Sequence, residues 1–208
     1  MIQPIILAGG QATRLPNKPL LPITGGRLSI ESAMEYAKTF CPGFLPILVD
    51  NSAEIISRVL TLRGWDFHLC IQPKPQGVPD AIYRGLDFAS GTMLLILFCD
   101  NIYDHFDEPP SRPGVSTLMR TSNVLDGCDG SQWLTHPDGS MLRIAGFYVL
   151  TREQASQGVP DESSVEFLNR IGVRPIVLPQ DTAWWDIGTP VSYTEYLTCC
   201  SAAQFHAK

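Results

Sequence analysis

The chain has 208 residues, of which 44% are hydrophobic and 17% charged, and its formal net charge is −6. This length accommodates one domain with a full hydrophobic core, so we expect a single domain over 1–208, with halves 1–103 and 104–208. The negative charge argues against a broad basic surface for nucleic acid, and no apolar run is long enough to span a membrane. The six cysteines have neither CxxC nor zinc-type spacing. They favour reduced thiols and, with no leader-like opening, a cytoplasmic protein.

The first half of the sequence alternates short apolar runs with amphipathic segments. The apolar runs predict strands at Ile2–Leu7, Leu45–Val49, Phe67–Ile71 and Met93–Cys99. The amphipathic segments predict helices at Ser29–Phe40, Ser52–Leu62 and Pro79–Ala89. Ser29 is the expected N-cap of the first helix, whose apolar face consists of Ile30, Ala33, Met34, Ala37 and Phe40. Strands that alternate with helices predict an α/β fold with a mainly parallel sheet.

The second half has a less regular pattern and opens with an acidic, proline-rich loop expected over Asp104–Pro113. Pro137-Asp138-Gly139 is a good hairpin turn, and it predicts paired strands at Gln132–His136 and Met141–Leu150. The remaining elements are expected as strands at Val115–Arg120 and Arg174–Leu178, and as helices at Glu162–Ile171 and from Val191 onward.

The segment 7–22, with the sequence LAGGQATRLPNKPLLP, follows the first predicted strand directly. Gly9 and Gly10 allow backbone N–H groups to face an anion, because no Cβ stands in the way. Arg14 can bind two phosphate oxygens at once, and Lys18 adds a mobile positive charge. The segment lacks both the Walker pattern and the dinucleotide-binding fingerprint. It predicts a phosphate-binding loop of another kind, with a plain strand-to-helix turn as the alternative.

This segment resembles the signature loop of the sugar-nucleotide pyrophosphorylases, the nucleotidyltransferases that join a sugar 1-phosphate to a nucleotide. The matching motifs cover nearly the whole chain and are most similar to those of glucose-1-phosphate thymidylyltransferases, in a short form. The resemblance implies a Rossmann-like three-layer α/β fold with a mainly parallel central sheet and a small antiparallel hairpin region on the sugar side. It implies that Arg14 and Lys18 are catalytic, and that the nucleotide contacts Leu7, Ala8, Gly9, Gly10, Thr13 and Arg14. Ala12 departs from the family, which usually has glycine there.

Two acidic residues are candidates for metal binding. Asp100 follows the buried run Met93–Cys99, and ligands of open α/β sheets bind beyond the carboxyl ends of strands. A simple turn at Asp100-Asn101 is the alternative, but the segment 98–103 resembles the family's Gly-Asp-Asn-Ile-Phe element. Asp186 lies in WWDIGTP (184–190), which resembles the family's Trp-x-Asp-Ile-Gly-Thr-Pro element. Two carboxylates together with phosphate oxygens suit Mg²⁺, the expected cofactor. The resemblance also places Asp100 at the nucleotide as a catalytic residue and Asn101 at the sugar.

The segment 72–81, QPKPQGVPDA, follows the third predicted strand and resembles the family's base-reading loop. The Gln72 amide offers both a donor and an acceptor to a pyrimidine, and Gly77 lets the backbone approach the ring. Uracil and thymine present the same edge, so UTP and dTTP are not separated. A proline-stiffened surface turn is the alternative.

The segment 144–149 resembles the family's sugar-side strand, which places Gly146 at the sugar, and Glu162 is a further candidate for sugar contact. The family normally carries a Glu-Lys-Pro hairpin just before this strand, and its lysine holds the product phosphates. This sequence has no lysine between Lys74 and Lys208. Arg120 and Arg143 are the cationic candidates to replace it, and solvent-facing side chains are the alternative for both.

These features predict a sugar-1-phosphate nucleotidyltransferase that uses UTP or dTTP, a hexose 1-phosphate and Mg²⁺, and releases pyrophosphate. We expect these small molecules as partners, no nucleic acid or membrane, and a monomer or small homo-oligomer. Two rivals remain open. One is an enzyme of the kind that attaches guanylate to molybdopterin, which shares the Leu-Ala-Gly-Gly-Gln opening. The other is a non-catalytic nucleotide-binding homologue that lost the hairpin lysine.

Overall fold

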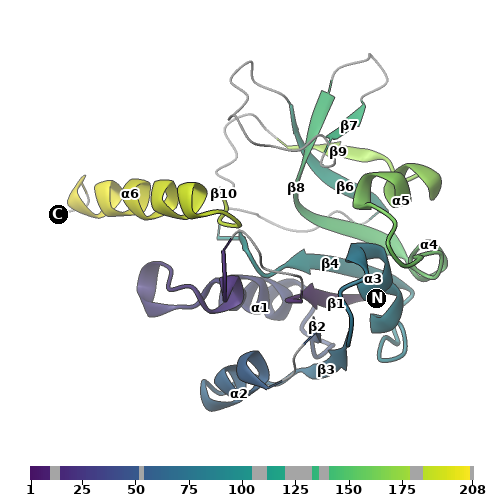
Figure 1. Cartoon of the computed structure of the whole chain (residues 1–208), viewed down its shortest axis with the longest axis horizontal. Helices are drawn as coiled ribbons and strands as arrows, with labels where there is room; N and C mark the ends of the chain where they lie inside the picture. Colours follow the sequence, from purple (N-terminus) through teal and green to yellow (C-terminus); the bar gives the residue numbers. More distant parts are fainter. Residues whose placement is uncertain are drawn as a thin grey trace.

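The computed structural model describes residues 1–9, 15–51, 54–104, 112–119, 133–135, 141–178 and 185–206. In this part of the chain a central β-sheet is covered by helices on both faces, which gives three layers (Figure 1). The three-layer α/β fold predicted from the sequence is therefore confirmed.

The central sheet contains strands from both halves of the sequence. Its members are β1 (Ile2–Leu7), β2 (Ile47–Asp50), β3 (His68–Ile71), β4 (Met93–Phe98), β6 (Gly114–Met119), β7 (Trp133–Thr135), β8 (Met141–Thr151) and β9 (Pro175–Val177). Their order is β3-β2-β1-β4-β8-β6-β9, and β7 also pairs with β8. Two short strands, β5 (Asn101–Ile102) and β10 (Trp185–Asp186), form a separate antiparallel pair.

The direction of the strands divides the sheet into two parts. β3, β2, β1 and β4 all run parallel, as expected for strands joined by helices. β8 runs antiparallel to its neighbours β4, β6 and β7, while β9 runs parallel to β6. The mainly parallel sheet with an antiparallel hairpin region is thus confirmed, although the turn at 137–139 lies outside the described residues.

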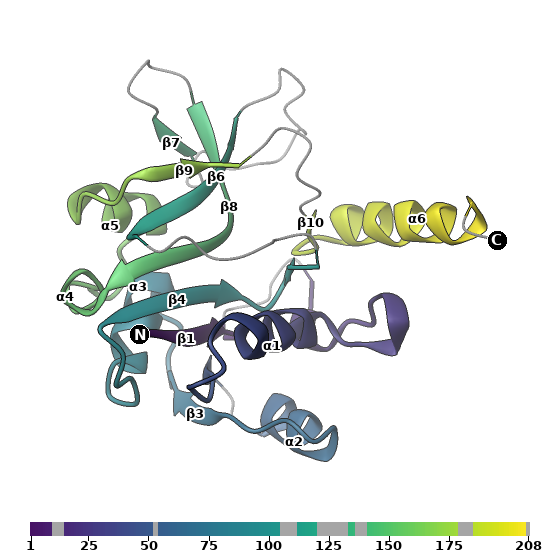
Figure 2. The same ribbon diagram turned by 180° about the vertical axis from the view of Figure 1, so that it is seen from behind.

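Different sets of helices cover the two faces of the sheet. The α-helices are α1 (Ser29–Phe40), α2 (Ile55–Leu62), α3 (Gly77–Gly85), α4 (Arg152–Ala155), α5 (Ser164–Arg170) and α6 (Pro190–His206), and two 3-10 turns are η1 (Lys18–Leu20) and η2 (Thr24–Gly26). Side chains from α1 and α2 pack on one face, and side chains from α3, α4 and α5 pack on the other. Figure 2 shows the same layers from behind.

Alternating side chains explain why both faces need cover. Ile5 and Leu7 of β1 join the core under α3 and α5, whereas Ile6 joins the core under α1. Successive side chains of a strand point to opposite faces, so an unbroken apolar run requires a helical layer on each side. The apolar face predicted for α1 is confirmed, because Ile30 and Met34 are fully buried in that second core.

α6 extends away from the sheet and ends at the C-terminus (Figures 1 and 2). Its first turns are anchored by Tyr196, which packs with Ile23, Ile102 and Ile187 in a third apolar cluster. No helix among the described residues has the length and apolarity that a membrane crossing requires.

The expected N-cap role of Ser29 is wrong. Leu28 occupies the N-cap position, and the Glu31 carboxylate accepts a hydrogen bond from the Leu28 N–H at 2.7 Å. Ser29 is the first helical residue instead. Its hydroxyl donates to the carbonyl oxygen of Lys18 at 2.7 Å and lies 2.8 Å from that of Cys99. The Ser29 hydroxyl therefore binds backbone oxygens that are distant in sequence instead of capping the helix.

Two further helices begin at residues other than those expected. α3 begins at Gly77 rather than at Pro79, so the proline lies within its first turn. α5 begins at Ser164 rather than at Glu162, because the Ser163 hydroxyl accepts a hydrogen bond from the Glu166 N–H and caps the helix there. The residues 52 and 53, where the second helix was expected to begin, lie outside the described part.

Tyr103 links β5, β4 and β8 from inside the core. Its buried hydroxyl accepts a hydrogen bond from the Phe98 N–H at 2.7 Å and donates to the Gly146 carbonyl oxygen at 2.7 Å. Removing that oxygen leaves a buried donor and a buried acceptor without this partner, which is more costly than losing an exposed hydrogen bond.

We therefore expect Tyr103→Phe to lower the free energy of unfolding by about 1–3 kcal/mol, measured by urea denaturation. Tyr193→Phe is the matched control, since the Tyr193 hydroxyl donates to the Pro22 carbonyl at 2.7 Å at the surface. The control should lose roughly 0.5 kcal/mol or less. Equal losses in the two variants would contradict the structural role of Tyr103.

Candidate active site

The carboxyl ends of the four parallel strands meet at one edge of the sheet. The residues found there are Ala8 and Gly9 after β1, Asn51 after β2, Gln72 after β3, and Cys99 and Asp100 after β4. Ligands of open α/β sheets bind at this edge, which makes it the expected location of the site.

The turn after β1 starts with a close contact to β2. The N–H groups of Ala8 and Gly9 donate to the carbonyl oxygen of Val49, at 2.9 and 3.0 Å. A Cβ at Gly9 would lie 3.1 Å from the backbone nitrogen of Asn51, so a side chain there would crowd β2. Gly10, Thr13 and Arg14 lie outside the described residues. The structure thus describes the start of the predicted phosphate-binding loop and not its tip.

A cavity of about 470 Å³ opens on the β2 and β3 side of this turn. Leu7 and Gly9 line one part of it, and Gln72 and Gly77 of the predicted base-reading loop line another. Gly77 has a φ of +90°, and a Cβ there would lie 3.1 Å from the Glu162 carbonyl oxygen, so glycine is required twice over. The cavity combines apolar walls with a few polar groups, as small-molecule sites do.

On the other side of β1, two acidic residues come together. Asp186 of β10 pairs with Asn101 of β5, directly after Asp100, and the Ile187 N–H donates to the Asp100 carbonyl oxygen at 2.8 Å. The Lys18 Nζ lies 3.3 Å from Asp100 Oδ2. Three residues predicted from separate motifs therefore share one place at the sheet edge.

Gly188 marks the point on which these charged groups converge. A Cβ built on Gly188 would lie 2.8 Å from Asp186 Oδ1, 3.1 Å from Asp100 Oδ2 and 3.4 Å from Lys18 Nζ. The Gly188 N–H also donates to Asp186 Oδ1 at 2.9 Å. The absence of a side chain at this position leaves the space between the two carboxylates and the lysine open.

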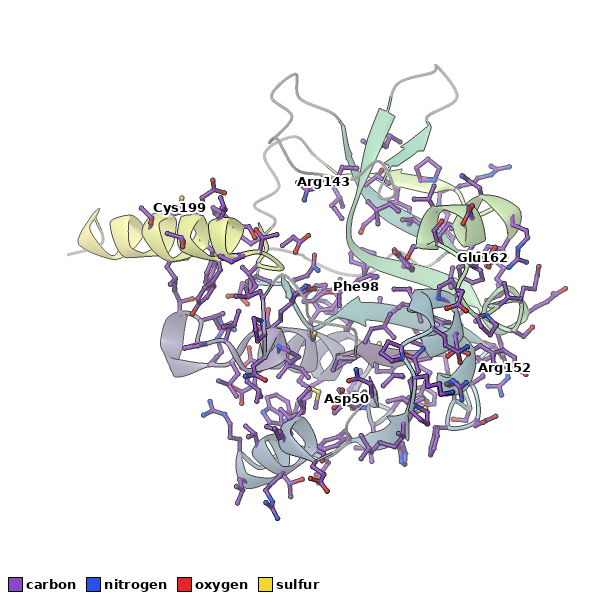
Figure 3. The ribbon with its side chains drawn as sticks, viewed as in Figure 1. Asp50, Phe98, Arg143, Arg152, Glu162 and Cys199 are labelled. Carbon is purple, nitrogen blue, oxygen red and sulfur yellow. The ribbon has the colours of Figure 1, made fainter. Side chains whose placement is uncertain are left out.

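The charges of the acid pair are only partly compensated. Burial raises the pKa of Asp186, and the negative charge of Asp100 raises it further, while the Gly188 N–H, Arg143 and Lys18 act in the opposite direction. Arg143 Nη2 lies 3.8 Å from Asp186 Oδ2. In Figure 3, Arg143 is seen on the β8 side above the end of β4, where Phe98 is labelled. A partly buried carboxylate pair of this kind favours a bound cation.

The donor set suits Mg²⁺, because carboxylate oxygens are the hard ligands that this ion prefers. Among the described residues no group of three or more His, Cys, Asp or Glu side chains could hold a metal ion on its own. Asp100 and Asp186 would therefore share the ion with water and substrate oxygens, as is usual for Mg²⁺. Burial raises the pKa of the Cys99 thiol well above the ordinary value, which disfavours the nucleophilic thiolate at this position.

The residues predicted for the sugar are more dispersed. The Asn101 amide donates to Asp100 Oδ1 at 3.2 Å. Gly146 has a φ of +70°, and its carbonyl oxygen already accepts the Tyr103 hydroxyl. Glu162 lines the cavity, but both of its carboxylate oxygens bind Arg170, at 2.8 and 2.7 Å. In Figure 3 it lies beside α3 and α5, far from the labelled Arg143.

One residue of the site, Gly188, was not predicted from the sequence, and another, Arg143, was predicted only as one of two alternatives. Gly188 stands inside the Asp-Ile-Gly-Thr-Pro motif, which was the available signal, but its role depends on what surrounds the missing Cβ. Arg143 was one of two open candidates for a phosphate-binding cation. The structure places it against Asp186, whereas Arg120 lies outside the described residues.

Comparison with known proteins rests on structure alone, since no family model and no curated protein matches the sequence. A protein from Bacillus anthracis, assigned as a glucose-1-phosphate thymidylyltransferase, matches with a TM-score of 0.70 and 19% identity, covering 94% of both chains. HddC from Yersinia pseudotuberculosis matches with a TM-score of 0.68 and 21% identity, covering 94% of this chain and 98% of that one. The CTP:phosphocholine cytidylyltransferase LicC from Streptococcus pneumoniae has a TM-score of 0.68 and 15% identity, covering 93% and 96%.

The chain has the nucleotidyltransferase fold. Nearly the full length of each neighbour is covered, so the similarity extends over both halves of the sheet. The neighbours named as transferases act on different substrates, a sugar phosphate in one and phosphocholine in another. The shared fold therefore does not determine the substrates.

The acid pair predicts a pH-dependent stability in the absence of divalent cations. Because the pKa of Asp186 is raised, the folded protein holds a proton there more tightly than the unfolded chain, and stability falls as the pH rises through that raised pKa. We expect Asp186→Asn to be more stable than the wild type at pH 7, by on the order of 1 kcal/mol. The difference in stability between this variant and the wild type should vanish near pH 4, where Asp186 of the folded wild type is protonated.

Urea unfolding in EDTA at the two pH values would test this. Asp104→Asn is the control, since Asp104 Oδ1 accepts a hydrogen bond from Arg27 Nη1 at 3.0 Å and its charge is compensated. That variant should be less stable than the wild type at pH 7. A wild type more stable than Asp186→Asn at pH 7 would contradict the repulsion.

Proposed function

We propose that the protein is a nucleotidyltransferase that joins a pyrimidine nucleoside triphosphate, UTP or dTTP, to a hexose 1-phosphate. One observation carries the proposal: Asp100, Asp186 and Lys18 converge on Gly188 beside the turn after β1, and the cavity with Gln72 and Gly77 lies on the other side of that turn. In this proposal, a base, a phosphate chain and a cation would lie one after another along the sheet edge.

The proposed positions of the substrates follow from the chemistry of each part. The base would occupy the cavity, where Gln72 offers a polar contact and Gly77 allows close approach. The triphosphate would cross the turn that begins at Gly9, where Arg14 is the expected phosphate ligand. The acceptor phosphate would then lie near Asp100 and Asp186, on the β4 side.

The reaction would be an in-line attack of an acceptor phosphate oxygen on the α-phosphorus, which forms one P–O bond. The bond to the bridging oxygen breaks at the same centre, and pyrophosphate leaves with the electron pair. A phosphate monoester has a second pKa of about 6, so it is mostly dianionic at pH 7 and needs no general base. The protein therefore acts by positioning the reactants and neutralising their charge.

The side chains would divide this work. Lys18, held 3.3 Å from Asp100, would stabilise negative charge on the transferring phosphate, together with Arg14. Asp100 and Asp186 would hold a magnesium ion, which supplies Lewis-acid neutralisation of phosphate charge when bound. Arg143, on the sugar-side strand β8, would contact the acceptor phosphate and so take the part of the family's hairpin lysine.

The proposal predicts Mg²⁺-dependent pyrophosphate release. We expect turnover with UTP or dTTP plus a hexose 1-phosphate, measured over a matrix of triphosphates and sugar 1-phosphates with product mass as the second readout. Turnover with GTP and a pterin acceptor would favour the molybdopterin-type activity instead. Nucleotide binding with no release for any pair would favour a non-catalytic homologue.

Asp100→Asn should reduce turnover by at least roughly a hundredfold while the fold is retained, because it removes one anionic ligand of the proposed ion. Circular dichroism and the unfolding midpoint would verify the fold. Glu153→Gln, on the short helix α4 outside the site, is a charge-matched control expected to keep full activity. Unchanged turnover in Asp100→Asn would remove this residue from the mechanism.

Gly188→Ala tests the open space between the carboxylates without changing any charge. Its Cβ would displace the two carboxylates by contacts of 2.8 and 3.1 Å, so Mg²⁺-dependent binding of the triphosphate should weaken roughly tenfold or more. Titration calorimetry with and without Mg²⁺ would measure this. Gly43→Ala is the matched control, because a Cβ there meets nothing within 4 Å. Wild-type Mg²⁺ dependence in Gly188→Ala would contradict the placement of the ion.

A further inference from the structure

Gln72 is one of the polar residues that line the cavity, and its hydrogen-bond partners fix the orientation of its amide group. The residue follows β3, is only 3% exposed, and its backbone N–H donates to the Asp50 carbonyl oxygen at 2.8 Å. A buried amide has few rotamers open to it once its partners are set. The hydrogen-bond partners of Oε1 and Nε2 therefore decide whether a donor or an acceptor faces the cavity.

The amide nitrogen of Gln72 is used up within the protein. Nε2 donates to Asp80 Oδ2 at 2.7 Å and to the Gly77 carbonyl oxygen at 3.2 Å. A carboxylate and a carbonyl only accept hydrogen bonds, so the amide must turn its nitrogen toward them, and both of its hydrogens are then engaged. The amide oxygen is the one atom left to face a ligand in the cavity.

Asp80 stands behind Gln72 and does not line the cavity itself. It lies on α3, is 3% exposed, and Oδ2 also accepts a hydrogen bond from Arg84 Nε at 2.7 Å. The ion pair with Arg84 keeps a negative, purely accepting group at this position. Asp80 can therefore act on a ligand only through Gln72.

We propose that Asp80 is a positioning residue that sets the base specificity of the site by presenting Gln72 to the cavity as an acceptor alone. This inference rests on the proposed function. An acceptor at that point matches the N3–H of uracil or thymine, whereas N3 of cytosine carries a lone pair that would face the Gln72 oxygen. The Gly77 N–H, in the first turn of α3 and without an intrahelical partner, suits a carbonyl oxygen beside that N3–H.

The isosteric substitution Asp80→Asn tests whether Asp80 holds the Gln72 amide in this orientation. Asparagine offers both a donor and an acceptor, so Gln72 is free to turn its nitrogen toward the cavity. We expect the wild type to bind UTP at least roughly tenfold more tightly than CTP, because the mismatch leaves polar groups unpaired. In Asp80→Asn this ratio should narrow to about threefold or less.

Titration calorimetry with Mg²⁺ would give the two affinities, and the unfolding midpoint would show that each variant is folded. Arg84→Lys is the control, since it disturbs the ion pair but leaves the Asp80 carboxylate as acceptor. It should change stability and keep the ratio of UTP to CTP affinity. A ratio that falls equally in both variants would show that Asp80 has only a structural role.

Further outcomes separate this inference from the proposed function. A wild type that binds no triphosphate would overturn both. A preference for UTP that survives Asp80→Asn, or a wild type that prefers CTP, would overturn the role of Asp80 and leave a nucleotidyltransferase in place. If Asp80→Asn does not fold, the wild type itself provides the test: the triphosphate of pyrimidin-2-one riboside, whose N3 carries no hydrogen, should bind at least tenfold more weakly than UTP, and equal affinity would refute the acceptor.

Discussion

The closeness of Asp100 and Asp186 is the constraint on which the proposed site depends. Burial raises the pKa of Asp186, and the negative charge of the nearby Asp100 carboxylate raises it further. Lys18 Nζ, 3.3 Å from Asp100 Oδ2, and Arg143 Nη2, 3.8 Å from Asp186 Oδ2, partly compensate the two negative charges. An arrangement selected for stability alone would place apolar side chains here. In the proposed function, the acid pair would be the anionic part of a site that binds a cation and a phosphate chain.

The order of the strands places the acid pair and the cavity on opposite sides of β1. β1 lies between β2, which borders the cavity, and β4, which carries Asp100. A ligand that extends from Gln72 to Asp100 must cross the turn after β1, where Gly9 brings the backbone close to β2. In the proposed function, the base would lie at the ends of β3 and β2, the phosphate chain at the end of β1, and the cation at the end of β4. Solved structures of proteins named for a sugar phosphate and for phosphocholine match over 94% and 93% of this chain.

Local patterns in the sequence were enough to predict the elements that frame the site. The period of the apolar residues in Ser29–Phe40 defined α1, and the unbroken run at Met93 defined a strand buried on both faces. Features that depend on distant partners could not be predicted. Ser29 gave up its expected cap for the Lys18 carbonyl, and the orientation of Gln72 follows from an aspartate eight residues away across a helix turn. The role of Gly188 likewise depends on what its missing Cβ would meet, which no local pattern records.

The short ladder between β5 and β10 has a consequence for how the molecule comes into being on the ribosome. It joins residue 101 to residue 186, so half of the acid pair is translated more than eighty residues after the other. The four parallel strands and much of the cavity wall can assemble earlier, from contacts within the first hundred residues. The rest of the cavity wall, at Asp161, Glu162, Ser163 and Glu166, is translated after that stage. In the proposed function, the site would therefore gain its second carboxylate only after the strands that border the phosphate chain have been made.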